Sequence, residues 1–168
     1  MGSEMCIRDS YKREGSQIAG NMREIFLDTT YVMPFFYMDI DVKGFSRKKY
    51  AELIRKFDKI HLSEISIFEA KVKSLQIKSK EVLEKFNKGL SILRSDRRVR
   101  IHGFNERHDR ALNSMLNLLD DLNIIDLIIV SQAKDVGVLL TEDNVIHKHK
   151  DEIGLDVLNW KSFVALNK

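Results

Sequence analysis

The chain alternates short apolar runs with longer stretches in which apolar residues recur every three or four positions. The short runs are typical of strands buried in a parallel sheet, and the longer stretches are typical of amphipathic helices. Strands are predicted at residues 24–27, 59–62, 99–102, 138–141 and 155–158. Helices are predicted at residues 31–38, 47–57, 63–75, 82–93, 106–119, 124–136, 144–151 and 160–166. Strands that alternate with helices indicate an α/β fold with a parallel sheet and right-handed crossovers.

Polar residues and glycine mark where several of these helices begin and end. Ser46, Ser63 and Asn123 each stand directly before a helical pattern, where a side-chain oxygen can accept a backbone N–H. Gly137 stands just after one, as a glycine at a helix C-terminus does. Residues sharing one face of the helix after Ser63 are Ile65, Phe68, Val72 and Leu75. Residues expected to face inward on the helix at 106–119 are Leu112, Met115, Leu116 and Leu119.

Composition limits the class of protein. With 168 residues, of which 43% are hydrophobic and 32% charged, the chain is long enough for one globular domain with a substantial core. No apolar run approaches the roughly 20 residues of a membrane helix. The net charge of +3 permits a polyanionic partner without requiring one. Cys6 is the only cysteine, which excludes an internal disulfide and a cysteine-based zinc site.

The first residues differ from the rest of the chain. Residues 1–20 are polar, carry three glycines and show no periodicity, and they lack the apolar centre of a secretory signal. We interpret residues 1–21 as a vector-derived leader or disordered tail, with Met22 as a candidate natural start, and residues 22–168 as a single domain. Without the leader the domain contains no cysteine, which fits a cytoplasmic protein.

Four acidic residues fall where a parallel sheet would bring distant segments together. Asp28 follows the first predicted strand, and Asp143 follows the strand at 138–141. Glu69 lies in the second turn of the helix after the second strand, and Asp126 lies in the first turn of the helix that leads to residue 138. Because crossover helices start at the carboxyl edge of the sheet, we expect all four side chains at this edge, where open α/β sheets bind their ligands.

Each acid also has an ordinary structural explanation. Asp28 and Asp143 can cap the helices that follow them, Asp126 can interact with its helix dipole, and Glu69 can pair with Lys73 four residues later. If the carboxylates do meet, a cation has to offset their repulsion, and it is either a Lys or Arg network or a metal. With no cysteine or histidine beside these motifs, an all-oxygen site favours Mg²⁺ or Mn²⁺ over Zn²⁺.

Three stretches taken in order, FLDTT, SEISIFEAK and DLNIIDLIIVSQAKDVGVLLTED, resemble the PIN-domain ribonucleases, of the VapC-like toxin type or the archaeal stand-alone type. The resemblance spans residues 22–163. In that family a strand ends in Asp and hydroxyl residues, and a helical Glu follows. A third acid opens a helix that ends in a small residue and glycine, and Thr-x-Asp follows an apolar strand. The matching residues are Asp28, Thr29, Thr30, Glu69, Asp126, Ala133, Gly137, Thr141 and Asp143.

The resemblance implies a fold, an activity and partners. The implied fold is a three-layer α/β/α sandwich with a five-stranded parallel sheet. The implied activity is hydrolysis of RNA phosphodiester bonds by a Mg²⁺- or Mn²⁺-dependent endoribonuclease, in which the metal lowers the pKa of a bound water. Thr29 or Thr141 would orient a carboxylate or hold a metal-bound water. Family analogy also suggests a homodimer and, for a toxin, an antitoxin partner. The residues implied to be catalytic and to bind the metal are Asp28, Glu69, Asp126 and Asp143.

Other functions compete with this hypothesis. A toxin and an RNA-processing nuclease both fit the resemblance. A catalytically silent PIN fold that binds RNA or protein is the main alternative from another class. A phospho-receiver domain also has an Asp after its first strand, but the acidic doublet near the first strand of such domains is missing here.

Several further residues are candidates for the site or for RNA binding. Glu64 competes with Glu69 as the second acid, although residues five apart point to different faces of a helix and Glu69 fits the family spacing better. Lower-ranked acids are Asp120, Asp121 and Glu142. A basic run can either guide an RNA backbone to the acids or form a solvated charged face, and its residues are Arg94, Arg97, Arg98 and Arg100.

Aromatic residues 35–37 follow the first acid. We expect at least one in the core, and an exposed set would suit a dimer face, a partner groove or base stacking. The five histidines show no ligand spacing, so we expect them to be surface or core residues.

Overall fold

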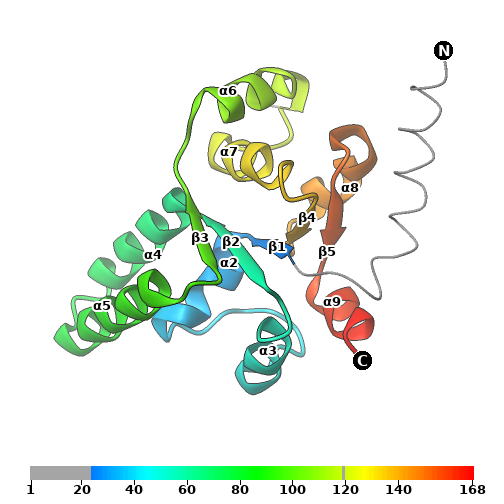
Figure 1. The fold of residues 1–168 in the computed structure, drawn as a ribbon. Helices are drawn as coiled ribbons and strands as arrows, with labels where there is room; N and C mark the ends of the chain where they lie inside the picture. Colours follow the sequence, from blue (N-terminus) through cyan, green and yellow to red (C-terminus); the bar gives the residue numbers. More distant parts are fainter. Residues whose placement is uncertain (1–23, 119) are drawn as a thin grey trace, which may run out of the picture.

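The computed structural model describes residues 24–118 and 120–168. Its centre is a sheet with the strand order β3-β2-β1-β4-β5 (Figure 1). All neighbouring strands are parallel, so the predicted five-stranded parallel sheet is confirmed. The predictions for residues 1–21 and for Leu119 lie outside the described residues. The strands are β1 (Glu24–Leu27), β2 (Lys59–Ser63), β3 (Val99–His102), β4 (Val138–Leu140) and β5 (Asp156–Leu158).

Helical segments connect every strand to the next. No described helix is long and apolar enough to cross a membrane. Ser46, Ser63 and Asn123 cap helices with their side chains as predicted. The segments are α2 (Thr29–Val32), η1 (Met33–Phe36), α3 (Arg47–Ile54), α4 (Glu64–Gln76), α5 (Lys80–Ser95), α6 (Glu106–Asn113), η2 (Leu116–Leu118), α7 (Ile124–Ala133), α8 (Asn144–Ile153) and α9 (Trp160–Leu166).

Helices cover both faces of the sheet, which makes the fold a three-layer α/β/α sandwich (Figure 1). Alternation along β1 shows how the layers divide, because successive strand side chains point to opposite faces. Ile25 and Leu27 belong to a core with α2, η1, α3, α5 and α9. Phe26, between them, belongs to a second core with α6, α7 and α8. All three side chains are fully buried, as expected for a strand covered on both sides.

The segment after β1 is not the single helix predicted at 31–38. It consists of α2 followed by the 3₁₀ turn η1, and the turn ends at Tyr37 in the left-handed conformation with φ 61°. Pro34 lies in the first turn of η1, where it has no N–H to continue the α-helical pattern. Phe36 is buried and Tyr37 is exposed, so the aromatic stretch is divided between core and surface.

Helix α4 buries a different face from the one that its large apolar residues suggest. Its buried residues are Ser66, Ala70 and Ser74, whereas Phe68 is 66% exposed and Leu75 is 51% exposed. Short side chains on the buried face let the helix lie close to the core beneath it. The periodicity therefore predicted the helix correctly, and the structure shows that this helix buries its small residues.

Helix α6 and the turn after it show a similar difference. Leu112 and Met115 are buried as predicted, but Leu116 is 45% exposed, so its predicted inward position was wrong. The predicted helix at 106–119 stops at Asn113, and Leu116 begins the short 3₁₀ turn η2. The change from α-helical to 3₁₀ geometry rotates later side chains away from the face that a continuous helix would bury.

A glycine lets α5 approach η1 closely. A Cβ atom at Gly89 would lie 2.3 Å from the backbone oxygen of Phe35, which is too short for any side chain. The same contact brings the rings of Phe36 and Phe86 into a stack with centroids 4.4 Å apart. Gly89 is therefore required by packing, even though glycine weakens a helix.

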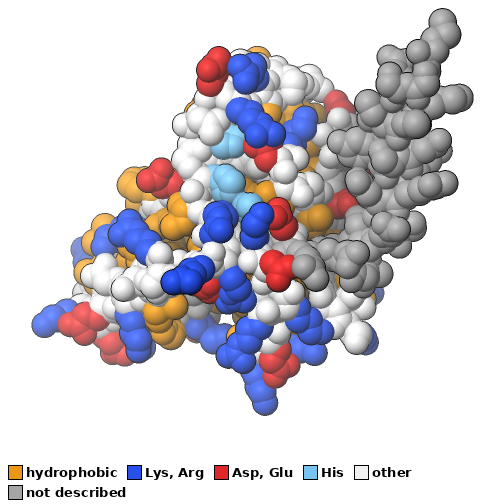
Figure 2. Space-filling view, viewed as in Figure 1, with side chains coloured by type: hydrophobic (Ala, Val, Ile, Leu, Met, Phe, Trp, Pro, Cys, Tyr) orange, Lys and Arg blue, Asp and Glu red, His pale blue; other side chains and the backbone are white. Residues whose placement is uncertain are grey.

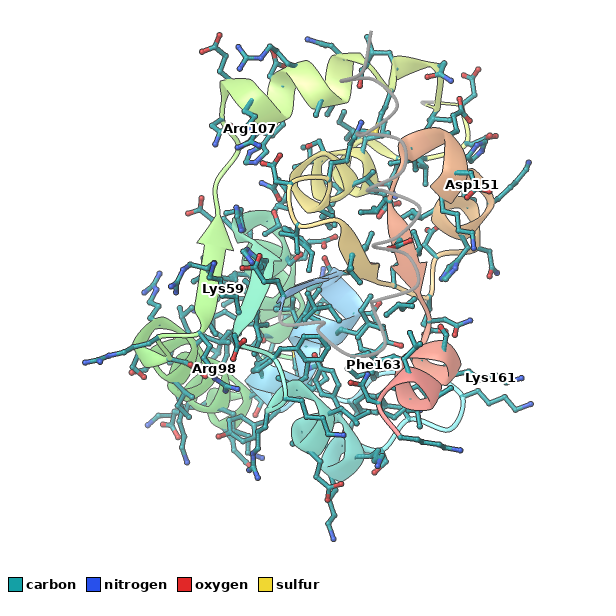
Figure 3. All side chains as sticks on the ribbon, turned by 45° about the vertical axis from the view of Figure 1, so that its right-hand side comes forward. Lys59, Arg98, Arg107, Asp151, Lys161 and Phe163 are labelled. Atoms are coloured by element: carbon teal, nitrogen blue, oxygen red, sulfur yellow. The ribbon has the colours of Figure 1, made fainter. Side chains whose placement is uncertain are left out.

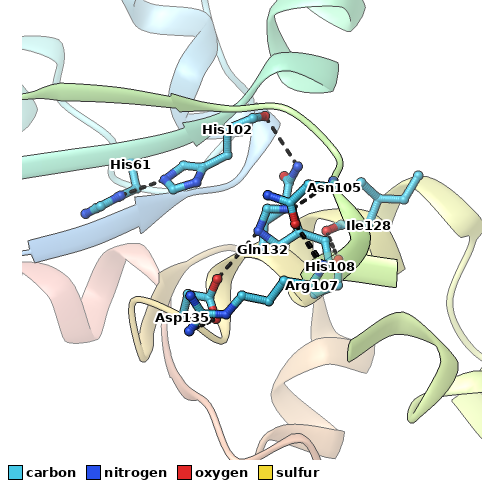
Figure 4. Close-up of polar contacts among 9 residues, drawn as sticks. His61, His102, Asn105, Arg107, His108, Ile128, Gln132 and Asp135 are labelled. Atoms are coloured by element: carbon cyan, nitrogen blue, oxygen red, sulfur yellow. Dashed lines mark hydrogen bonds and ion pairs between the residues drawn. The ribbon is translucent and has the colours of Figure 1, made fainter. Parts of the chain in front are cut away.

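Three histidines form part of a polar cluster between the sheet and α6 and α7 (Figure 4). A hydrogen bond of 2.7 Å joins Nδ1 of His61 to Nε2 of His102. His108 accepts the backbone N–H of Asn105, and its Nε2 lies 3.5 Å from Asp135. Burial lowers the pKa of His61 and of His102. The His61–His102 bond joins β2 to the edge strand β3, and Gln132 on α7 donates to the backbone oxygen of His102. The cluster therefore links the edge of the sheet to α7.

Candidate active site

A pocket of about 310 Å³ opens at the carboxyl edge of the sheet. The four predicted acids line it, although they come from four separate segments. Two residues that the sequence analysis did not assign to the pocket wall, Thr30 and Lys73, also line it. The full lining is Asp28, Thr29, Thr30, Glu69, Lys73, Asp126 and Asp143.

Asp28 is held in place by the two strands at the centre of the sheet. It follows β1, and its backbone N–H donates to the oxygen of Leu140 on β4 at 3.1 Å. Its Oδ2 accepts the Thr141 hydroxyl at 2.6 Å, and its Oδ1 accepts the N–H of Thr29 at 2.7 Å. Asp28 caps α2, as its ordinary structural explanation requires, and the same side chain also lines the pocket.

Thr29 connects Asp28 and Glu69, because its backbone N–H donates to Asp28 and its hydroxyl donates to Glu69. The Thr29 hydroxyl donates to Oε2 of Glu69 at 2.5 Å and lies 2.8 Å from the Ser66 hydroxyl. Because Thr29 has one hydroxyl proton, Ser66 acts as donor in the second bond. Ser66 is fully buried on the inner face of α4. The pairing of Glu69 with Lys73 that the sequence allowed is not among the ion pairs of the described residues.

Asp143 and Asp126 are held from the other half of the domain. Oδ1 of Asp143 accepts the N–H groups of Val145 and Ile146 at the start of α8, at 2.8 and 2.9 Å. The backbone N–H of Asp143 donates to the Thr141 hydroxyl at 3.1 Å, so Thr141 contacts both Asp143 and Asp28. Asp126 lies in the first turn of α7 and its backbone is capped by Asn123. Its carboxylate has no hydrogen-bond partner among the described residues.

The electrostatics of the pocket oppose full ionisation. Burial raises the pKa of Asp28, and the nearby Asp143 and Glu69 raise it further, against the effect of its hydrogen bonds from Thr141 and Thr29. Burial also raises the pKa of Asp126 to about 6, and Asp28, Asp143 and Glu69 contribute by repulsion. Carboxylates gathered without a cation repel one another in this way.

The donor set of the pocket suits a hard divalent cation. All four acids offer oxygen atoms, which Mg²⁺ and Mn²⁺ prefer. In the present arrangement no three His, Cys, Asp or Glu side chains among the described residues are grouped to hold a metal together. Asp28, Glu69 and Asp143 each direct an oxygen to a protein donor instead. Each carboxylate keeps further lone pairs that could bind a metal. The residues therefore fit a divalent cation, but their side chains would have to rotate to coordinate it together.

The lower-ranked acids lie elsewhere. Glu64, on the first turn of α4, is exposed and does not line the pocket, whereas Glu69 does. Glu142 accepts the hydroxyl of Tyr31 and the backbone N–H of Trp160, so it joins α2 to α9. Asp121 pairs with His149 at 2.9 Å, and the exposed Asp120 is not part of the lining.

The basic run lies at the opposite end of the sheet from the acids. Arg98 directly precedes β3, and its backbone oxygen accepts the N–H of Ile60 near the start of β2. Figure 2 shows Lys and Arg side chains spread over this side of the molecule with acids between them. Arg98 of the run pairs with Asp96. Two basic residues outside the run, Lys59 and Arg107, lie on the same β2–β3 side (Figure 3) and also have acidic partners. The remaining arginines of the run, all exposed, are Arg94, Arg97 and Arg100.

An α/β/α sandwich with this five-stranded parallel sheet is a PIN-like fold, and solved structures share it. One similar chain belongs to the crystal structure of VapBC2 from Rickettsia felis bound to a DNA fragment from their promoter. It is 22% identical, with a TM-score of 0.58, over 82% of this chain and 98% of that one. Another belongs to VapBC-1 from nontypeable Haemophilus influenzae. It is 18% identical, with a TM-score of 0.59 and the same coverage.

These likenesses confirm the predicted PIN-like fold. No protein-family model matches the sequence, and no curated protein does either.

Proposed function

We propose that this protein is a metal-dependent endoribonuclease that hydrolyses RNA phosphodiester bonds. The observation that carries the proposal is the meeting of Asp28, Glu69, Asp126 and Asp143 in one pocket. None of them forms an ion pair with a described Lys or Arg residue. Repelling carboxylates at a ligand-binding edge are expected where a cation is to be bound. The PIN-like fold, shared with the VapBC structures, supports the same function.

The four carboxylates would hold Mg²⁺ or Mn²⁺ in this proposal. The metal would lower the pKa of its bound water and neutralise the phosphate. Thr141 would keep Asp28 and Asp143 in register, because it contacts both. Thr29 would orient Glu69. These hydroxyls would act as the outer partners that fix the position of metal-binding carboxylates.

Replacing one central carboxylate tests the proposal. Asp28→Asn keeps the size of the side chain and the oxygen that caps Thr29, but it removes the charge. We expect cleavage of single-stranded RNA with Mn²⁺ to fall by more than about 100-fold, the upper end for losing an outer partner of a metal ligand. Circular dichroism should show an unchanged fold. The matched control is Asp151→Asn on the exposed side of α8, which should cleave like the wild type. An Asp28→Asn variant with full activity in Mn²⁺ would reject this site.

A catalytically silent PIN fold that binds RNA or protein is the competing function. Calorimetric titration with Mn²⁺ distinguishes the two, because a silent fold has no need of a metal. Binding at high micromolar Mn²⁺ or below, lost in Asp28→Asn, supports the nuclease. An absence of binding favours the silent module.

We further propose an antitoxin as partner, which would make the protein the toxin of a toxin–antitoxin pair. The support is the likeness to chains from two VapBC structures. Co-expression with the small protein encoded next to this chain tests it. Co-purification in fixed stoichiometry, with RNA cleavage suppressed in the complex, is expected for a toxin. An RNA-processing nuclease would purify alone and remain active.

We also propose a homodimer. Apolar side chains reach the surface near α4 and α5 (Figure 2), and the exposed ones include Phe68, Leu75 and Ile77. Exposed apolar groups on one region are typical of an association surface. Light scattering after size-exclusion chromatography should give twice the mass of the chain, and Phe68→Ser should shift the species toward the monomer.

A further inference from the structure

Lys73 is a cation on the wall of an otherwise acidic pocket. It lies on α4, one helical turn after Glu69, and it lines the pocket together with the four carboxylates. Its side chain is exposed, so the ammonium group can move at the pocket mouth. Lys71, two residues earlier, lies over the ring of Phe86 at 4.9 Å, on a different side of the helix.

Lys73 does not neutralise the acids that surround it. The spacing from Glu69 to Lys73 would suit an ion pair. Instead, Oε2 of Glu69 accepts a hydrogen bond from the Thr29 hydroxyl, and that hydroxyl is also hydrogen-bonded to the buried Ser66. No ion pair or hydrogen bond within the described residues involves the Lys73 side chain, whereas Lys59, Lys80 and Lys85 each have a carboxylate partner. The positive charge is therefore available to something that enters the pocket.

We infer that Lys73 binds a phosphate of the RNA substrate at the mouth of the pocket. This inference rests on the proposed nuclease function. A lysine ammonium is a compact charge with three donors on a flexible stem, and it binds phosphate as a point charge. Next to the scissile bond it would hold the phosphate against the carboxylate-lined wall and stabilise the negative charge that develops there. The other role open to such a lysine, holding the carboxylates together, would affect metal binding instead.

Three variants separate these roles. Lys73→Gln removes the charge, and Lys73→Arg restores it. Lys80→Gln is the matched control, because it removes a lysine charge outside the pocket lining, from a side chain that is 92% exposed. For each variant we would measure single-turnover cleavage of single-stranded RNA with Mn²⁺ and the Mn²⁺ affinity by calorimetry. RNA binding would be measured over a range of salt concentrations with Ca²⁺ in place of Mn²⁺. Melting temperatures would verify folding.

For Lys73→Gln we expect a loss of about 100-fold in cleavage rate, the lower end for removing one group that stabilises developing charge, and Lys73→Arg should recover most of it. The slope of log affinity against log salt should fall by about 0.7, the value for one phosphate contact on a single strand. Mn²⁺ affinity should stay equal or become tighter.

Two results would overturn the inference while the nuclease proposal stands. In the first, Lys73→Gln cleaves RNA as fast as Lys80→Gln. In the second, Lys73→Gln loses Mn²⁺ affinity in step with its loss of activity. A wild-type protein that cleaves no RNA would remove both proposals.

Discussion

Asp126→Asn should make the metal-free protein more stable. The Asp126 carboxylate has no hydrogen-bond partner among the described residues, and burial and three neighbouring acids raise its pKa from 3.8 to about 6. Asparagine has nearly the same shape and carries no charge. The substitution therefore removes repulsion without removing a contact within the described part of the chain.

The pKa of Asp126 sets an upper limit on the gain. A rise from 3.8 to about 6 corresponds to roughly 3 kcal/mol against the ionised form. Because Asp126 is only half-buried, solvent screening reduces this to about 1–2 kcal/mol. For a domain of this size that is a rise in melting temperature of roughly 3–6 °C.

The gain should depend on pH in one direction. The native state holds a proton on Asp126 more tightly than the unfolded state, so its ionisation costs stability only above the unfolded pKa. The advantage of Asp126→Asn should be complete above about pH 6 and should disappear as pH falls towards 3.8. The relief is absent below that pH because the carboxyl is then protonated in both states.

Thermal unfolding with EDTA at several pH values checks this, with Asp151→Asn as the control for removing a surface charge. Adding Mn²⁺ should raise the melting temperature of the wild type and have a much smaller effect on Asp126→Asn, because a ligand that binds the native state stabilises it. An Asp126→Asn protein that melts at or below the wild-type temperature at pH 7.5 in EDTA would refute the repulsion argument.

Two other substitutions test the parts that hold the site. Thr141→Val removes the hydroxyl that contacts Asp28 at 2.6 Å and the Asp143 N–H at 3.1 Å. We expect the free energy of unfolding, measured by chemical denaturation, to fall by about 1–3 kcal/mol, and the acid limb of the pH–rate profile to move to higher pH. An unchanged profile would count against the role of Thr141. Gly89→Ala places a Cβ 2.3 Å from the Phe35 oxygen. Despite the better helix propensity of alanine, we expect the free energy of unfolding to fall by about 1–3 kcal/mol. A more stable variant would disprove the close approach of α5 to η1.

The sequence was sufficient to predict the sheet and the positions of the acids. Strands β1 and β4 carry short apolar runs, whereas β3 alternates apolar and polar residues. The placement of Asp28 and Asp143 follows from the geometry of parallel strands, because both follow strands whose carboxyl ends lie at the same edge. The choice of Glu69 over Glu64 came from family spacing, and the structure places Glu69 in the pocket lining.

Other features depend on tertiary packing, which periodicity does not reveal. Helix α4 leaves its large apolar residues Phe68 and Leu75 exposed and buries serine and alanine instead. From the sequence, Lys73 was predicted only as a possible ion-pair partner of Glu69. The Thr29 hydroxyl that occupies the Glu69 carboxylate comes from a segment 40 residues away, and helix spacing does not reveal it. The separation of the basic run from the acids required the orientation of β3, since Arg97 and Arg98 precede that strand and the acids lie beyond the other end of the sheet.

The central claim is that four carboxylates from separate segments form one metal site. The most direct test is a crystal soaked in Mn²⁺ and measured at a wavelength where manganese scatters anomalously. We predict an anomalous peak in the pocket, within coordination distance of oxygens from Asp28 and from at least two of Glu69, Asp126 and Asp143. A soaked crystal with no peak there, or with manganese only at surface carboxylates outside the pocket, would contradict the account.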